Sequence, residues 1–408
     1  MASKNMLANH ARYRLASEND AMGNTRGKND VPTSNVSRQA LGEINQLNTG
    51  LARRNAQGGK GSGEKKHSSK SRACSTHQPT VEEVEAPPHS PLLRAELPAS
   101  DNCTPGTYNP FAIINAPAVP PMIRDVDTSD HHNPQLVSEY INEIYIYLRR
   151  LERQQPVRPD YMAGYAITPR MRAILVDWLV QVHTRFGFLQ ETLYLTISII
   201  DRYLQIEEVN KSKLQLVGVT AMWIASKYEE TLEVEVADFV YITDNSYTTA
   251  TMRQMERRIL KKLEFNLGRP LPLHFLRRYS KVAEVDSMRH TLAKYLLELS
   301  ILDYHLVHYH PSEISAASLC LSIELLDEQG RTSEPFWNET LAFYSTYSQE
   351  HLNPIMYRLA LLVYKSPVCK QKATRHKYKS SKFMQISTLE ELQSVLIEDY
   401  AARAKDVS

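Results

Sequence analysis

Residues 171–183 constrain the fold more than any other part of the chain. They read Met-Arg-Ala-Ile-Leu-Val-Asp-Trp-Leu-Val-Gln-Val-His, and at about 100° per residue the apolar side chains point nearly all round a helix axis. Such a helix is usually buried on most sides, so other helices must surround it. Met171, Leu175, Trp178 and Val182 form a stripe that fits either a buried core or one wall of a peptide-binding groove. Periodicity does not distinguish the two.

The chain after residue 125 contains a series of helical segments. An Asn133-Pro134 pair begins the first, which continues to Leu151. Gly is sparse, and no segment shows the clean alternation of a strand, so we expect an all-α fold. Further helices are expected at 168–186, 189–205, 211–230, 234–242, 248–264, 272–283, 287–302, 311–326, 333–345 and 349–365.

A linker divides these helices into two series. Residues 266–272 read Asn-Leu-Gly-Arg-Pro-Leu-Pro, with one Gly and two Pro. Residues 219–226 in the first series and 315–322 in the second echo one another as helices of small residues, which suit the centre of a bundle. We therefore expect two tandem five-helix lobes preceded by an N-terminal helix.

The beginning of the chain differs from the rest in composition. Residues 1–125 are rich in Asn, Ser, Gly and Pro and lack sustained apolar periodicity, so they cannot offset chain entropy by burial. Residues 1–80 hold 13 Lys and Arg against 5 Asp and Glu, a balance of +8 in a chain of net charge +2. We expect a disordered region at 1–125, the N-terminal helix and first lobe at 126–267, the second lobe at 268–395 and a C-terminal tail at 396–408.

Motifs for catalysis and for cofactor binding are missing. The sequence has no Gly-x-Ser-x-Gly, and Lys60 in the Gly-rich run at 58–63 is followed by Gly61, where a phosphate-binding loop needs Ser or Thr. Four Cys without Cys-x-x-Cys spacing indicate neither a zinc site nor a disulfide framework. His308 and His310 cannot share one helix face. We expect no enzyme, no metal and no cofactor.

Charge and hydropathy argue against two classes of partner. A net charge of +2 does not favour a strongly basic nucleic-acid binder. No run of about 18 apolar residues predicts a membrane span, and the first residues lack the apolar core of a secretory signal. The basic stretch at 370–382 is interpreted as a solvated loop or as a contact for an anionic protein.

Four charged residues lie within or beside the apolar helices. Arg172 and Asp201 need partners if they are buried, and we expect them to pair with one another across neighbouring helices. Lys227 and Glu256 either lie on a solvated face or act together as long hydrogen-bonding side chains toward the backbone of a partner.

The first lobe closely resembles the cyclin box in five segments: 171–180, 190–195, 200–204, 213–218 and 225–230. Their ordered spacing is far more specific than a lone short motif. Residues 274–281, 290–296 and 310–316 are similar to the second box of B-type, mitotic cyclins. The resemblance covers roughly 125–395. It implies a regulatory subunit that binds and activates the mitotic cyclin-dependent serine/threonine kinase and drives the G2/M transition.

The resemblance assigns roles to the charged residues. In cyclins a cationic and an acidic residue of the first box hydrogen-bond the kinase, and these correspond to Lys227 and Glu256. Arg172 and Asp201 resemble the structural ion pair of the family, with Leu216 as its apolar companion.

The resemblance also implies hydrophobic contacts with the kinase, both on the N-terminal helix and around the kinase's mobile helix. Tyr140, Ile144 and Tyr147 match the face of the N-terminal helix. Tyr228 and Phe265 match the contacts around the mobile helix.

A groove that docks Arg-x-Leu segments of substrates and regulators is implied as well. Gln181 stands where many cyclins have an acidic residue, and Lys211 where some have Arg; losing an acid weakens attraction to a cationic peptide. The residues assigned to the groove are Met171, Leu175, Trp178, Gln181, Lys211 and Gln215.

The disordered region carries a short motif that resembles a destruction box, the degron read by the anaphase-promoting ubiquitin ligase. Arg38 and Leu41 supply its Arg-x-x-Leu core, and Gly42 and Ile44 lie directly after it. We expect this regulatory motif to bring about ubiquitin-mediated destruction at mitotic exit.

Two further expectations concern regulation. Ser90 and Thr104 each precede Pro and fit minimal proline-directed phosphorylation sites. By analogy with the family, the protein is expected in the cytoplasm during interphase and in the nucleus as mitosis begins.

Three other functions compete with this interpretation. A double cyclin fold like that of transcription factor IIB binds DNA, but it needs a basic face on the folded lobes. A pocket-protein-like scaffold binds peptides without activating a kinase. A helical enzyme lacks any candidate arrangement of nucleophile and base.

Overall fold

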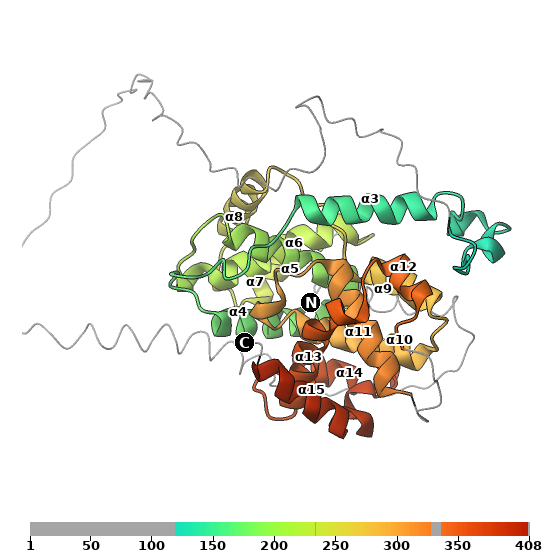
Figure 1. The fold of residues 1–408 in the computed structure, drawn as a ribbon. Helices are drawn as coiled ribbons and strands as arrows, with labels where there is room; N and C mark the ends of the chain where they lie inside the picture. The colour runs from blue at the N-terminus through green and yellow to red at the C-terminus, as the bar shows by residue number, and fades with distance from the viewer. Residues whose placement is uncertain (1–118, 233, 328–335, 407–408) are drawn as a thin grey trace, which may run out of the picture. The chain divides into compact units, whose positions relative to one another are not determined.

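The structure is a computed structural model that describes residues 119–232, 234–327 and 336–406. Within these ranges every regular element is helical, which confirms the expected all-α class. Figure 1 shows two groups of helices that come one after the other along the chain. None of the described helices combines the length and apolar character needed to cross a membrane.

Five helices form the first bundle: α4 (Pro169–Phe186), α5 (Gln190–Leu204), α6 (Leu214–Glu229), α7 (Val236–Ile242) and α8 (Thr249–Lys262). The ends of α4 are explained by local chemistry. The Thr168 side chain accepts a hydrogen bond from the backbone of Met171, Pro169 occupies the first turn, and Gly187 ends the helix at φ +69°. The helix therefore begins and ends within one residue of the predicted range.

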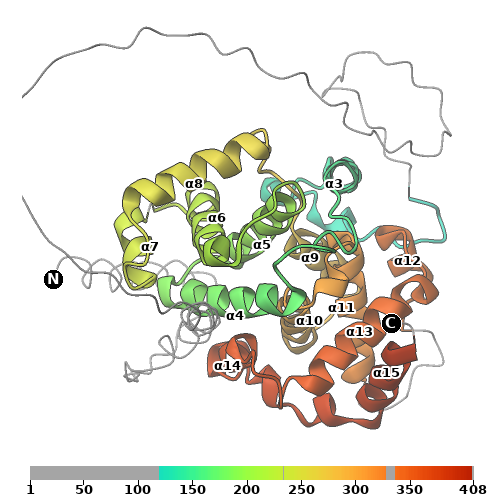
Figure 2. The ribbon, with the colours of Figure 1, turned by 90° about the vertical axis from the view of Figure 1, so that its left-hand side faces the viewer.

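Helix α6 lies at the centre of this bundle and packs on α4, α5, α7 and α8 (Figure 2). Gly218 allows its closest approach to α4, because a Cβ atom at Gly218 would lie 2.7 Å from Leu175 Cδ1. Small residues at this centre let two backbones approach, as the sequence predicted.

The second bundle repeats the arrangement with α9 (Pro272–Val282), α10 (Ser287–Ser300), α11 (Pro311–Leu325), α12 (Glu339–Ser345) and α13 (Gln349–Lys365). Helix α11 packs on α9, α10 and α13, and Ala316, Ala317 and Ser318 are fully buried. The echo between 219–226 and 315–322 thus marks the central helix of each bundle. The helix expected at 333–345 begins at Glu339, and the first residues of that prediction lie outside the described ranges.

The N-terminal helix is shorter than predicted. Asn133 caps a single 3-10 turn, η2 (Pro134–Leu136), and Val137 then adopts a left-handed conformation at φ +50°. Helix α3 starts only at Ile141 and runs as Ile141–Gln154. The continuous helix expected from Asn133 is wrong, because the capped turn ends within four residues.

Side chains of α3 anchor it to the second bundle. An Nη2–H of Arg149 donates to Tyr279 Oη at 2.8 Å and to the carbonyl of Ser345 at 2.5 Å. Glu152 accepts hydrogen bonds from the hydroxyl and the backbone N–H of Ser312, at 2.6 and 3.2 Å. Polar contacts with the second bundle therefore fix the inner face of α3.

The chain beyond α13 is more ordered than the sequence suggested. The basic stretch at 370–382 contains α14 (Ala373–Tyr378), which packs on α4 of the first bundle. The ring of Tyr378 is fully buried, and Lys377 pairs with buried Glu298 at 2.7 Å. The interpretation as a solvated loop is therefore wrong, because this stretch bridges the two bundles.

The residues beyond 395 also form a helix. Most of the segment set apart as a tail at 396–408 belongs to α15 (Val395–Asp406), which packs along α13. Residues 407–408 lie outside the described ranges.

Candidate functional site

Lys227 and Glu256 lie side by side at the surface of the first bundle. Lys227 is in the last turn of α6 and Glu256 is in α8, and the two side chains form an ion pair. The Lys227 ammonium also lies 3.8 Å from the ring centroid of Trp223, a cation–π contact. Both side chains remain partly accessible, with exposed fractions of 32% and 15%, so a second protein can reach them.

The two helices that carry this pair lead to exposed aromatic side chains. Tyr228 is 55% exposed, and Phe265, on the segment after α8, is 67% exposed. A Cβ atom at Gly268 would lie 3.0 Å from Tyr228 Oη, so the end of α6 and the segment between the bundles are in contact. Exposed aromatic groups of this size are typical of interaction surfaces.

Helix α3 contributes exposed hydrophobic residues of its own. Tyr140, at the start of the helix, is 60% exposed, and Ile144 and Tyr147 are also exposed. We call Tyr140, Ile144, Tyr147, Tyr228 and Phe265 together the aromatic surface. All five match contact residues of the cyclin family, and only that resemblance predicted them.

Leu232 and Tyr241 are also exposed, and the sequence did not point to either of them. Leu232 and Tyr241 come after the exposed end of α6, in the connection to α7 and on α7 itself. Leu232 stands among acidic residues in the sequence, and an isolated apolar residue in such a segment is the signal that could have revealed it.

Arg172 and Asp201 form the ion pair that the sequence predicted. Arg172 Nε donates to Asp201 Oδ1 at 2.6 Å and its Nη2 donates to Oδ2 at 2.7 Å, and both side chains are buried. Burial opposes the guanidinium charge, but Asp201 raises the pKa of Arg172. The hydroxyl of Tyr161 donates to the same carboxylate at 2.8 Å. Leu216 is also buried.

This ion pair also joins the two bundles. Arg172 Nη1 donates to the carbonyl of Ile301, which comes directly after α10 in the second bundle, at 2.8 Å. Its contacts are therefore structural, in agreement with the interpretation preferred from the sequence.

The expected docking groove is not open at its two central residues. Leu175 is 1% exposed and Trp178 is fully buried, so both belong to the core. Gln215 is buried as well, and its Oε1 lies 3.4 Å from Tyr247 Oη. The groove prediction is wrong for these side chains. Leu175 and Trp178 lie on α4, which packs against α6 on one side and α14 on another, and Gln215 is buried on α6.

The remaining groove residues keep access to solvent. Met171 and Gln181 are half-buried, and Lys211 is exposed. Gln181 donates to Asp177 Oδ2 at 3.2 Å, so its amide is directed along α4.

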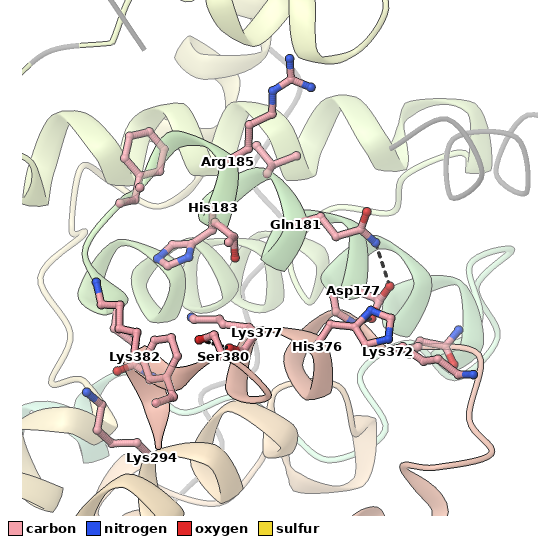
Figure 3. A pocket seen from close by; sticks show the side chains of 18 of the residues that line it. Asp177, Gln181, His183, Arg185, Lys294, Lys372, His376, Lys377, Ser380 and Lys382 are labelled. Carbon is pink, nitrogen blue, oxygen red and sulfur yellow. Dashed lines mark hydrogen bonds between the residues drawn. The ribbon is translucent and has the colours of Figure 1, made fainter. Parts of the chain in front are cut away.

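A cavity of about 1380 Å³ lies beside the end of α4 (Figure 3). Its walls come from α4, the start of α5, α9, α10 and the segment around α14. Burial lowers the pKa of Lys294, and the charges of Arg277 and Lys377 lower it further. The sequence analysis missed this cavity, because its residues come from distant parts of the chain. The cationic side chains lining it are Arg185, Arg277, Lys294, Lys370, Lys372, Lys377 and Lys382.

In the part of the chain that the structure describes, His, Cys, Asp and Glu side chains form no cluster able to hold a metal ion. The degron residues Arg38, Leu41, Gly42 and Ile44 and the phosphorylation candidates Ser90 and Thr104 lie outside the described residues.

Comparison with known proteins identifies the family. The model for the cyclin N-terminal domain matches residues 143–268 and that for the cyclin C-terminal domain matches residues 270–392. A solved viral cyclin from herpesvirus saimiri aligns with 53% of this chain and 96% of its own at 20% identity. Its TM-score of 0.47 is too low to add to the assignment.

Curated relatives give a finer assignment. The chain is 56% identical over 282 residues to G2/mitotic-specific cyclin-B2 of Anguilla japonica, covering 69% of this chain and 70% of that protein. It is 55% identical over 277 residues to cyclin-B of Patella vulgata, covering 68% and 66%. It is 49% identical over 350 residues to cyclin-B of Spisula solidissima, covering 82% and 80%. The chain is therefore a regulatory subunit rather than an enzyme, and it belongs to the cyclin family as a B-type cyclin.

Proposed function

We propose that this chain binds the mitotic cyclin-dependent serine/threonine kinase through Lys227, Glu256 and the aromatic surface, and so activates it for the G2/M transition. Membership of the cyclin family implies a regulatory role toward a cyclin-dependent kinase. The proposal adds which kinase is bound and which residues bind it. The observation that carries it is the accessible Lys227–Glu256 ion pair, together with exposed aromatic side chains on α3, at the end of α6 and after α8.

The mechanism is one of differential binding. Tyr228 and Phe265 pack around the mobile helix of the kinase, and the exposed face of α3 packs on the kinase as well. The mobile helix is thereby held inward, so that the kinase's own Lys–Glu pair forms and its activation loop opens. Lys227 and Glu256 hydrogen-bond the backbone of that helix and set its register. The cyclin favours the active conformation only by the extra affinity it has for it.

The test distinguishes an ion pair that only stabilises the fold from one that binds the kinase. In the double variant Lys227→Glu/Glu256→Lys the pair is kept with its charges exchanged, so a purely structural pair survives the exchange. We expect the exchange to weaken kinase binding by at least about tenfold, or 1.4 kcal/mol, with a parallel loss of histone phosphorylation. Titration calorimetry with the purified kinase measures the Kd.

The matched control exchanges a pair on α15. Arg403 and Asp399 lie 2.7 Å apart and are about half exposed, so Arg403→Asp/Asp399→Arg leaves the Kd unchanged. Normal binding by the exchanged Lys227–Glu256 pair contradicts the proposal. Binding without activation favours the scaffold alternative.

Docking of Arg-x-Leu segments is part of the proposal, but at accessible residues rather than at the buried Leu175, Trp178 and Gln215. We assign it to the accessible face around Met171, Gln181 and Lys211, with Leu175 and Trp178 supporting it from the core. Met171→Ala should raise the KM for a substrate that carries such a segment and leave the KM for a short peptide unchanged.

Timed destruction and nuclear entry complete the proposal, and they rest on the sequence and the family alone. Arg38→Ala/Leu41→Ala should prolong the half-life of the protein at mitotic exit through loss of recognition by the ubiquitin ligase, and a pulse-chase measurement checks this. Imaging of the tagged chain should show cytoplasmic protein in interphase and nuclear protein as mitosis begins.

A further inference from the structure

The segment between the two bundles has an unusual backbone. Glu264 and Phe265 both adopt left-handed conformations, at φ +52° and +58°. Bulky side chains rarely occupy this region, and such positions persist only where surrounding contacts fix them. Phe265 is largely exposed, so burial of its own ring does not supply those contacts.

Two buried polar side chains from separate elements hold this segment. Arg202, on α5, donates from Nη2 to the carbonyl of Asn266 at 2.6 Å. Gln155, directly after α3, donates from Nε2 to Asn266 Oδ1 and to the carbonyl of Gly268, both at 3.0 Å. Both side chains are more than nine-tenths buried. The residue directly after Phe265 is therefore fixed from two sides.

Burial of the Arg202 guanidinium has a large desolvation cost. Burial, together with the charge of Arg269, lowers its pKa to about 10. Its hydrogen bond goes to a main-chain carbonyl, whereas the buried Arg172 has a carboxylate partner. A buried cation bonded in this way stabilises the position of that carbonyl at the cost of its own desolvation.

We propose that Arg202 and Gln155 are positioning residues, which hold the segment 264–268 so that the Phe265 ring stands out from the surface toward the kinase. Gln155 has a second consequence. Because it comes directly after α3, its bonds tie the helix that carries Tyr140 and Tyr147 to the segment that carries Phe265. The inference rests on the proposed function, since it assigns residues that prepare that surface without touching the kinase.

Double-mutant cycles on the full chain test the inference. Arg202→Met and Gln155→Met remove the hydrogen-bond donors to Asn266 and Gly268 with little change in side-chain volume. Each substitution is introduced into the unchanged chain and into the Phe265→Ala variant. We expect each to weaken kinase binding about tenfold when Phe265 is present and less than about twofold in the Phe265→Ala background. Arg202→Lys, which keeps one donor, should recover part of the affinity.

The control is another glutamine that links the bundles. Gln190 donates to Glu298 Oε2 at 3.0 Å and to Tyr378 Oη at 2.9 Å, in contacts that involve α10 and α14. Gln190→Met should show no coupling with Phe265. Circular dichroism verifies that each variant folds, and Gln155→Met carries the test if Arg202→Met does not fold.

Equal losses of kinase affinity with Phe265 present and with Phe265→Ala overturn the inference, because they mean that Arg202 and Gln155 only stabilise the fold. An unchanged Kd for Phe265→Ala alone also overturns it, since there is then no side chain to position. The proposed function is judged separately by the exchange of Lys227 and Glu256.

Discussion

The central helices of the two bundles end in contrasting ways. If the echo of 219–226 in 315–322 is extended, Lys227 and Tyr228 at the end of α6 correspond to Ile323 and Glu324 at the end of α11. Tyr228 is more than half exposed. Glu324 is half-buried and accepts a hydrogen bond from Tyr400 Oη of α15 at 2.7 Å.

The difference arises from the segment that comes after each bundle in the chain. After the second bundle come α14 and then α15, which packs on α13 and reaches α11 through Tyr400. After the first bundle comes only the short segment at 263–271, which leaves Phe265 exposed. Among the residues that the structure describes, one scaffold therefore presents an open helix end in the first bundle and a covered helix end in the second.

The largest effect is expected at the junction that keeps the two bundles together. Arg172→Met leaves Asp201 buried without its cation and removes the bond to Ile301, so we expect a loss of about 3–5 kcal/mol in the free energy of unfolding. Urea titration followed by circular dichroism measures it.

The matched control is Arg258→Met, which removes a half-exposed partner of Glu207 and should cost no more than about 1 kcal/mol. Similar losses in the free energy of unfolding for Arg172→Met and Arg258→Met contradict the view that the Arg172–Asp201 pair holds the two bundles together.

The next largest effect concerns the helix that covers the second bundle. Ile397 of α15 is fully buried, and Ile397→Ala should destabilise the protein by about 2–4 kcal/mol. Loosening α15 exposes apolar surface on the second bundle, so binding of a hydrophobic dye should increase. The Kd for the kinase, measured below the unfolding transition, should not change. A weaker Kd shows that the covered end also takes part in binding.

Two tyrosine substitutions compare the open end of α6 with the covered end of α11 directly. Tyr228→Ala removes an exposed ring, so we expect a stability change within about 0.5 kcal/mol but a clear loss of kinase affinity. Tyr400→Phe removes the bond to Glu324, so we expect a stability loss of about 1 kcal/mol and unchanged affinity. Thermal unfolding measures the stability of both variants, and titration calorimetry measures their affinity for the kinase.

The last effect is a pH dependence that originates in the second bundle. Burial lowers the pKa of His290 to about 4, and the charges of Lys294 and Arg277 contribute. Between pH 6.5 and about 4 the unfolded chain binds a proton that the folded chain does not, so stability falls as the pH is lowered through this window.

His290 Nδ1 lies 2.8 Å from Ser280 Oγ, and His290→Asn places an amide near the same atom without a titrating group. Denaturant midpoints measured from about pH 7 to about pH 4.5 should therefore fall less steeply in this variant than in the unchanged chain. Identical slopes contradict the assignment to His290.

Local pattern predicted most helices because a helix is encoded within a few turns of sequence. Helix α4 carries its own cap at Thr168 and its own stop at Gly187, so its bounds were predictable. Helix α3 was misjudged because the turn at Asn133 also resembles a helix start. Helix α14 was missed because its stability depends on the cover that α4 and Glu298 provide for Tyr378 and Lys377.

The candidate site was predictable only in part. The resemblance to the cyclin box named Lys227, Glu256 and the aromatic surface, and the structure makes all of them accessible. It also assigned Leu175 and Trp178 to an open groove, whereas the structure buries them. The hydrogen bonds of Arg202 and Gln155 were beyond sequence reasoning, because their acceptors lie 64 and up to 113 residues away in the chain.

The sequence by itself determined the helical class, the two-fold repetition and the family, since these depend on periodicity and on ordered motifs that can be read along the chain. Tertiary structure alone decided which helix ends are covered and which apolar side chains stay exposed. The physical reason is that periodicity specifies how side chains are arranged around a helix axis, whereas exposure depends on neighbours that the chain brings in from elsewhere.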